Sequence, residues 1–287
     1  MEFDLFTKDI VENKWAVFGT EVYENGVLTH SFGDTDENIH EIYSATKSVL
    51  SMAAGIAWDR GLFDITKPLL DYLPKERIDV LPEKLKEQWK NISIERLMTM
   101  SVGDLPFRPE GEDQLDFSLR CEVKDPDARP FNYSNISAYL VGVALTHALK
   151  KDVGEFIEEE ILKPLGIEKY ELGRCTEGYF YGASKMRLTV HGLSQIGLVL
   201  FNRGIYNGKR ILSEEYIDRA TSVLQMNREG GYGYFFWKYK DGFSINGKWK
   251  QKCYILPKEG ILVTYLSHIE DDSHALLESM EKHILGL

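Results

Sequence analysis

Two side chains that together could perform nucleophilic chemistry lie three positions apart, at Ser44 and Lys47. Residues i and i+3 share one face of a helix, so we expect the serine hydroxyl and the lysine amine to lie within hydrogen-bond reach. A serine hydroxyl is a weak nucleophile until a neighbouring base accepts its proton. The pair therefore predicts a serine nucleophile with a lysine base.

The segment that follows Lys47 indicates how a lysine could act as a base. Residues 49–58 are apolar on nearly every side, which is typical of a helix buried in a domain core. Burial removes the amine from water and lowers its pKa toward neutral pH. A serine near the helix start also lies beside free backbone N–H groups and the positive end of the helix dipole, where an oxyanion would be stabilised.

Spacing alone does not establish this chemistry, because serine often caps helices and a lysine three residues later is usually solvated. The chain contains its own control, since Ser279 and Lys282 have the same spacing in a charged C-terminal segment. We interpret that second match as accidental. The chemistry at Ser44 and Lys47 therefore depends on partners from elsewhere in the chain.

Tyr133 and Asn135 are candidate partners, and they directly precede an expected helix over residues 136–150. A phenol beside a lysine can relay a proton to a leaving group, and an amide can hydrogen-bond both the lysine and a substrate. The structural alternative is that Ser134 or Asn135 caps the helix while Tyr133 packs against the core. The similar pair Tyr23 and Asn25 is explained by a hairpin turn.

Composition limits the classes of function. The chain has 287 residues and a net charge of −11, which argues against nucleic acid and anionic membranes as partners. No segment has the roughly 20 apolar residues that span a bilayer. Seven histidines show no metal-binding pattern, so we expect neither a metal nor a cofactor.

The N-terminus and the cysteines favour a cytoplasmic location. No basic and apolar leader opens the sequence, although a leader removed before this N-terminus is left open. Three widely separated cysteines favour reduced thiols. They are Cys121, Cys175 and Cys253.

The order of predicted elements indicates an α+β fold. Strand-like runs over residues 15–23 and 27–32 form a hairpin, and runs over 232–239, 243–256 and 260–267 form an antiparallel meander before a last helix over 273–284. Residues between these groups are mainly helical, with a long polar loop over 104–130. We predict a sheet domain from residues 1–74 and 175–287, with a helical domain of residues 75–174 inserted in it. A site between the two would be a cleft at a domain interface.

The combination of S-x-x-K and Y-x-N resembles the serine β-lactamase and penicillin-binding protein superfamily, especially its class C β-lactamase-like branch. That branch includes esterases, DD-peptidases and hydrolases of the 6-aminohexanoate-oligomer type. The resemblance covers about residues 13–268. Further stretches that carry it are residues 40–48, 61–68, 97–103, 161–167 and 181–189. It implies a β-lactamase/transpeptidase-like fold, with an antiparallel sheet flanked by helices and an inserted helical domain.

The third motif of that family, K-T-G or H-x-G on a strand that lines the cleft, differs in this chain. We place its equivalent at Ile245, Asn246 and Gly247, where isoleucine replaces the cationic or imidazole residue. In the family that residue helps to bind a substrate carboxylate. The resemblance further implies that the backbone N–H groups of Ser44 and Lys248 form the oxyanion hole.

The resemblance implies an acyl-transferring serine hydrolase. Ser44 would attack an ester or amide carbonyl with Lys47 as base, Tyr133 would relay the proton, and Asn135 would position Lys47 and the substrate. A small ester or amide is favoured because the usual carboxylate anchor is absent. The alternatives are a β-lactamase or D-Ala-D-Ala peptidase, and, in another class, a binding or sensor module that acylates slowly or not at all.

Overall fold

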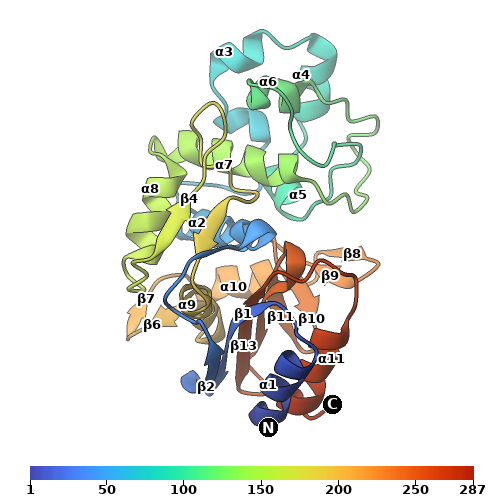
Figure 1. Ribbon diagram of the computed structural model, residues 1–287. Helices are drawn as coiled ribbons and strands as arrows, with labels where there is room; N and C mark the ends of the chain where they lie inside the picture. Colours follow the sequence, from blue (N-terminus) through green and yellow to red (C-terminus); the bar gives the residue numbers. More distant parts are fainter.

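The computed structural model describes residues 1–287 and has an antiparallel sheet of eight strands as its base (Figure 1). The strand order is β2-β1-β13-β12-β11-β10-β9-β8, so the N-terminal hairpin pairs with the last strand of the chain. The strands in this order are Val27–Gly33, Val17–Glu24, Ile261–Ser267, Gln251–Leu256, Gly242–Gly247, Trp237–Tyr239, Gly230–Tyr232 and Gln225–Asn227. The predicted α+β class, with a sheet built from both ends of the chain, is confirmed.

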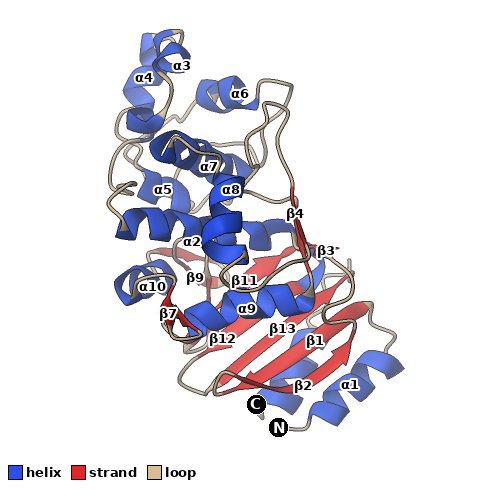
Figure 2. Ribbon diagram, turned by 90° about the vertical axis from the view of Figure 1, so that its left-hand side faces the viewer, coloured by secondary structure: helices blue, strands red, loops and turns tan.

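The two faces of the sheet are covered by different helices (Figure 2). Along β12, the side chains of Cys253 and Ile255 face helix α9 (Val190–Phe201), where a Cβ added at Gly197 would lie 2.6 Å from the Cys253 sulfur. The alternate residue, Tyr254, belongs to a second apolar cluster with α1 (Phe3–Glu12) and α11 (Ala275–Met280). Strand alternation therefore produces two cores, one on each side of the sheet.

Helix α2 (Thr46–Asp59) lies between the sheet and the helices that follow it in the chain, α3 to α8 (Figure 1). Every residue of α2 from Thr46 to Ala57 is buried, because its apolar surface contacts α7, α8 and α10. The other helices are α3 (Lys75–Asp79), α4 (Glu83–Trp89), α5 (Ile94–Met98), α6 (Gln114–Arg120), α7 (Asn135–Leu149), α8 (Val153–Ile157) and α10 (Glu214–Thr221). Short strands complete the fold: β3 (His40–Glu41), β4 (Tyr170–Leu172), β5 (Met186–Leu188), β6 (Ile205–Tyr206) and β7 (Lys209–Arg210). None of the helices combines the length and the apolar character needed to cross a bilayer. The division into domains at residues 74 and 174 stays a prediction.

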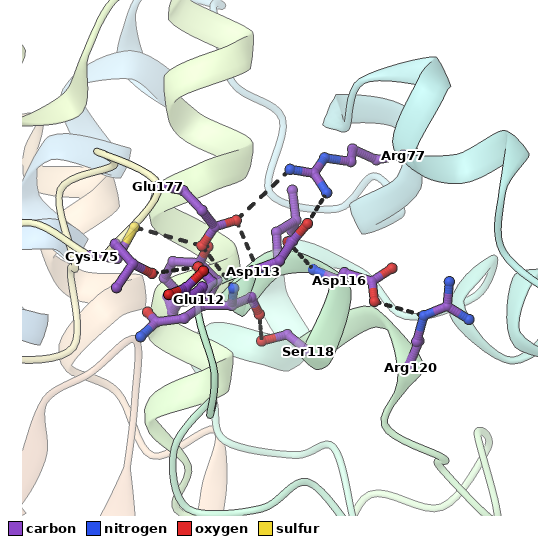
Figure 3. A network of polar contacts seen from close by, with 12 residues as sticks. Arg77, Glu112, Asp113, Asp116, Ser118, Arg120, Cys175 and Glu177 are labelled. Carbon is purple, nitrogen blue, oxygen red and sulfur yellow. Dashed lines mark hydrogen bonds and ion pairs between the residues drawn. The ribbon is translucent and has the colours of Figure 1, made fainter.

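The predicted loop over residues 104–130 contains a helix, α6, so that prediction was wrong in part. Leu115 and Leu119 of α6 are buried, and the Glu177 carboxylate accepts hydrogen bonds from the backbone N–H groups of Gln114 and Leu115, at 2.9 and 3.1 Å. Arg77 joins the same cluster by pairing with Asp113 (Figure 3). The carboxylate of Glu177, 63 residues further along the chain, thus accepts the hydrogen bonds of N–H groups at the start of α6 that have no partner within the helix.

One further prediction was wrong, and one helix was missed. The run over residues 243–256 is two strands, because the chain turns between β11 and β12 with positive φ angles at Trp249 (58°) and Lys250 (65°). The N-terminal helix α1 was not predicted. Its apolar residues Phe3, Phe6 and Ile10 are spaced by three and four and are buried under the sheet.

Candidate active site

Ser44 lies in a tight turn that precedes α2. The turn is a single 3-10 turn, Tyr43–Ala45, and Tyr43 has a positive φ of 48°. The Ile42 N–H donates to the carbonyl of Met186 at 3.0 Å, which fastens the turn to strand β5. Ser44 is partly exposed, whereas Ala45 and Thr46 after it are buried, so the hydroxyl lies at the boundary of the core.

Lys47 lies one helical turn after Ser44 and is 1% exposed. Its Nζ atom is 3.0 Å from the Ser44 hydroxyl, 2.7 Å from Oδ1 of Asn135 and 2.7 Å from the carbonyl oxygen of Ala183. Burial lowers the pKa of Lys47 to about 7, because no carboxylate offsets the loss of hydration. A substantial fraction of the amine is therefore neutral at physiological pH.

The partners of Lys47 decide where a neutral amine directs its lone pair. The amide oxygen of Asn135 and the carbonyl of Ala183 can only accept, so both N–H bonds of the neutral amine are directed to them. The third neighbour, the Ser44 hydroxyl, can donate. The geometry thus directs the lone pair of a deprotonated Lys47 toward the proton of Ser44.

Tyr133 lies beside this pair. The Lys47 Nζ atom is 5.0 Å from the centre of the Tyr133 ring, which itself contacts the rings of Tyr232 and Trp237. Burial raises the pKa of Tyr133 to about 12, with the Ser44 hydroxyl opposing part of that rise. The phenol consequently keeps its proton at neutral pH and is available as a donor.

The backbone around Tyr133 and Asn135 is held by the segment that follows α5. The Asn132 side chain donates to the carbonyls of Val102 and Leu105, both at 3.0 Å, and the Asn135 N–H donates to the Phe107 carbonyl at 2.6 Å. Ser134 is the N-cap of α7, as the structural alternative predicted. Capping by Ser134 leaves the Asn135 side chain free to contact Lys47, so the structural and chemical interpretations are compatible here.

The predicted third motif divides between two environments. Gly247 lies against the segment that leads into the Ser44 turn (Tyr43–Ala45), here called the nucleophile turn after the predicted role of Ser44, because a Cβ at Gly247 would be 2.2 Å from the carbonyl oxygen of Ile42. Ile245 is fully buried in the main core, and Asn246, which alternates with it along β11, points to the other face of the strand and lines a cavity there. Lys248 is exposed, with its Nζ atom 4.3 Å from the centre of the Trp249 ring.

Sequence reasoning missed three elements of the site. The Ala183 carbonyl has no side-chain signature, although it lies within the stretch 181–189 that carries the resemblance. Trp237 forms an aromatic wall against Tyr133. Gln251 is buried and its Nε2 donates to the carbonyls of Lys248 and Trp249, at 3.0 and 3.2 Å, which fixes the turn after Gly247.

Comparisons with known proteins identify the family of the chain. The beta-lactamase family model matches residues 19–279. A beta-lactamase from Yersinia enterocolitica is 24% identical over 139 residues, which are 47% of this chain and 34% of that protein, so the match spans about a third of the relative.

Two solved structures show the fold. One is a provisionally assigned 6-aminohexanoate-dimer hydrolase from Bacillus anthracis, with a TM-score of 0.79 and 18% identity over 96% of this chain and 82% of the other. Another is a class C beta-lactamase from Rhodobacter sphaeroides, with a TM-score of 0.75 and 16% identity over 99% of both chains. The predicted β-lactamase/transpeptidase-like fold and the resemblance to this superfamily are confirmed.

Proposed function

The chain belongs to the beta-lactamase family, and we propose that it is a serine hydrolase that cleaves a small ester or amide through an acyl-enzyme at Ser44. The observation that carries the proposal is the set of partners around Lys47. Two obligate acceptors occupy the N–H bonds of the neutral amine, and the Ser44 hydroxyl, at 3.0 Å, is the one of its three hydrogen-bond partners that can donate to it.

In the proposed reaction, the Ser44 oxygen attacks the substrate carbonyl carbon while its proton passes to Lys47. The backbone N–H groups of Ser44 and Lys248 stabilise the oxyanion, and the approach of Gly247 to the nucleophile turn supports this assignment. Tyr133 gives its proton to the leaving group and regains one from Lys47. Water then attacks the acyl-enzyme, which releases the acid and restores the Ser44 hydroxyl.

A small ester or amide fits the site better than a β-lactam. Ile245 stands where the family has a cation or imidazole, and its side chain is fully buried and cannot bind a carboxylate. A β-lactamase or D-Ala-D-Ala peptidase is the alternative activity. A module that acylates without turnover is the alternative from another class.

Covalent labelling tests the proposal and separates these cases. Wild type, Ser44→Ala and Ser279→Ala are treated with a fluorophosphonate probe and a fluorescent penicillin, and hydrolysis of nitrocefin is compared with that of a p-nitrophenyl ester panel. Ser279→Ala is the matched control because it removes the serine of the second S-x-x-K match. We expect ester turnover and labelling that only Ser44→Ala abolishes. Labelling without turnover would indicate a sensor, and labelling that survives in Ser44→Ala would overturn the proposal.

A further inference from the structure

A cavity of about 470 Å³ lies on the α11 side of the sheet, against β10 to β13. Its walls come from these strands and from the start of α11, which lies beside them (Figure 1). Four aromatic residues line it. Trp237 and Tyr239 are half-buried, whereas Tyr254 and Tyr265 are almost fully buried beneath them. A flat apolar group would bury a face against the Trp237 and Tyr239 rings.

The charged residues of the cavity are mainly cationic. Lys238, Lys250 and Lys252 line it, against the single carboxylate of Glu229. This excess of positive charge is notable in a chain with a net charge of −11. An anionic ligand would therefore find a favourable local field in an otherwise acidic protein.

Two polar groups in the cavity have no partner within the protein. Lys252 forms neither a hydrogen bond nor an ion pair, whereas Lys250 is held by the Ser273 carbonyl at 2.5 Å. The Oδ1 atom of Asn246 is buried without a hydrogen-bond donor. Burial lowers the pKa of Lys252 to about 8, so its amine is still mostly protonated at neutral pH. A half-buried cation that forms no direct ion pair or hydrogen bond is costly, and a ligand carboxylate would supply that contact.

The cavity adjoins the candidate active site. Trp237 is shared, since its ring lies 5.6 Å from that of Tyr133 and also lines the cavity. Asn246 immediately precedes Gly247, which contacts the nucleophile turn. Glu229 acts on both regions, because its charge raises the pKa of Tyr133 and that of Lys252.

We propose that this cavity binds an organic carboxylate with a flat apolar body, and that Lys252 is the cation that receives the carboxylate. This proposal rests on the function proposed above. The cavity would hold the acidic end of the substrate while the scissile carbonyl reaches Ser44. Lys252 extends from β12, so this anchor comes from a different strand than the replaced residue at Ile245. The rings supply the binding surface for the body of the ligand.

Binding is tested without catalysis, in the Ser44→Ala protein, by calorimetric titration with benzoate and with its neutral analogue benzyl alcohol. We expect benzoate to bind and benzyl alcohol to bind at least about tenfold more weakly. Adding Lys252→Gln should weaken benzoate binding by about tenfold or more, whereas Glu229→Gln should tighten it because a repulsive charge is removed. Lys258→Gln, an exposed lysine of the β12–β13 turn, is the matched control and should have no effect.

Misfolding would weaken benzoate binding in both Lys252→Gln and Glu229→Gln. Weaker binding in the first and tighter binding in the second would therefore reflect the charges of the cavity. Benzoate binding that is absent, or unchanged by Lys252→Gln, would overturn the proposal. In the active enzyme, a p-nitrophenyl ester of glutaric acid with one free carboxylate should lose at least about tenfold in kcat/KM in Lys252→Gln, while p-nitrophenyl pentanoate changes less than twofold. Absence of any ester hydrolysis would contradict the proposed function alone, because the titration does not depend on turnover.

Discussion

The amine of Lys47 donates to the amide oxygen of Asn135 at 2.7 Å, although 88 residues separate the two in sequence. The contact joins α2 to the start of α7 and uses an oxygen that can accept but not donate. It therefore fixes the amine without supplying a negative charge. A neutral partner leaves burial as the cause of the lowered pKa of Lys47.

The first prediction concerns the pH dependence of acylation. In the proposed mechanism the neutral form of Lys47 is the base, so kcat/KM for an uncharged ester should rise with pH through about 7 and then level off. Lys47→Arg should lose at least about 10³-fold, since a guanidinium stays protonated. Stopped-flow acylation between pH 5 and 9 measures the profile. A rate that is flat across pH 6–8 would show that another group acts as base.

Asn135→Asp should move that profile toward alkaline pH. A carboxylate at the position of Oδ1 would stabilise the ammonium form of Lys47 and raise its pKa by about one unit or more. We expect the plateau rate to be less affected than the rate at pH 7. Asn132→Asp is the control, because its side chain contacts the Val102 and Leu105 carbonyls and not Lys47. A profile that falls in amplitude without moving along the pH axis would contradict the electrostatic role of Asn135.

Tyr133→Phe removes the proposed proton donor but keeps the aromatic ring. Because burial raises the pKa of Tyr133 to about 12, the phenol is protonated across the working range and should cause no alkaline loss of activity below pH 10. We expect kcat to fall by about 10²- to 10⁴-fold for an alkyl ester, whose leaving group needs a proton, and much less for a p-nitrophenyl ester. Tyr179→Phe, whose hydroxyl contacts His147, should leave both rates unchanged. Equal losses for the two esters would argue for a packing role.

The parts of this site that could be predicted are those formed by residues close to one another in the sequence. Ser44 and Lys47 follow from one helical turn, and Tyr133 and Asn135 from one short segment before a helix. The Ala183 carbonyl could not be found, because a backbone oxygen has no residue type. The turn after Gly247 was also missed, because Trp249 and Lys250 adopt positive φ angles, which are expected from sequence mainly at glycine. Helix α6 escaped because its N-terminus depends on a carboxylate far along the chain, at Glu177.

Gln251 should act as a positioning residue for the proposed oxyanion hole. Its amide donates to the carbonyls of Lys248, Trp249 and Ser267, and its Oε1 accepts from the Ser267 N–H at 3.0 Å. Gln251→Leu should release the turn and lower kcat by about 10²-fold, with a smaller change in KM. Gln88→Leu is the matched control, since Gln88 is also buried and holds the Cys121 carbonyl at 2.7 Å. A loss of kcat no larger than in the control would mean that Gln251 contributes only stability.

The last prediction concerns stability away from the site, at Glu21 and His191. Glu21 is 1% exposed and accepts hydrogen bonds from the Tyr23 hydroxyl at 2.8 Å and from Nδ1 of His191 at 3.0 Å. The bond to Glu21 raises the pKa of His191 above its usual value of about 6.5, with burial opposing it. A raised folded-state pKa means that the stabilisation is fully present below about pH 6.5 and is lost as the pH rises through the folded-state value.

Urea unfolding of wild type and His191→Gln at several values between pH 5.5 and 9 isolates this contribution, because titration of Lys47 is common to both proteins and cancels in the difference. We expect the wild type to be more stable than the variant at pH 5.5, with the difference shrinking as the pH rises. Since the His191 side chain is 40% exposed, solvent screening should keep the change below about 1 kcal/mol. His268→Gln is the control, because that histidine pairs with the exposed Glu270. A difference that grows with pH would show that neutral His191, and not its cation, is the form that the buried carboxylate stabilises.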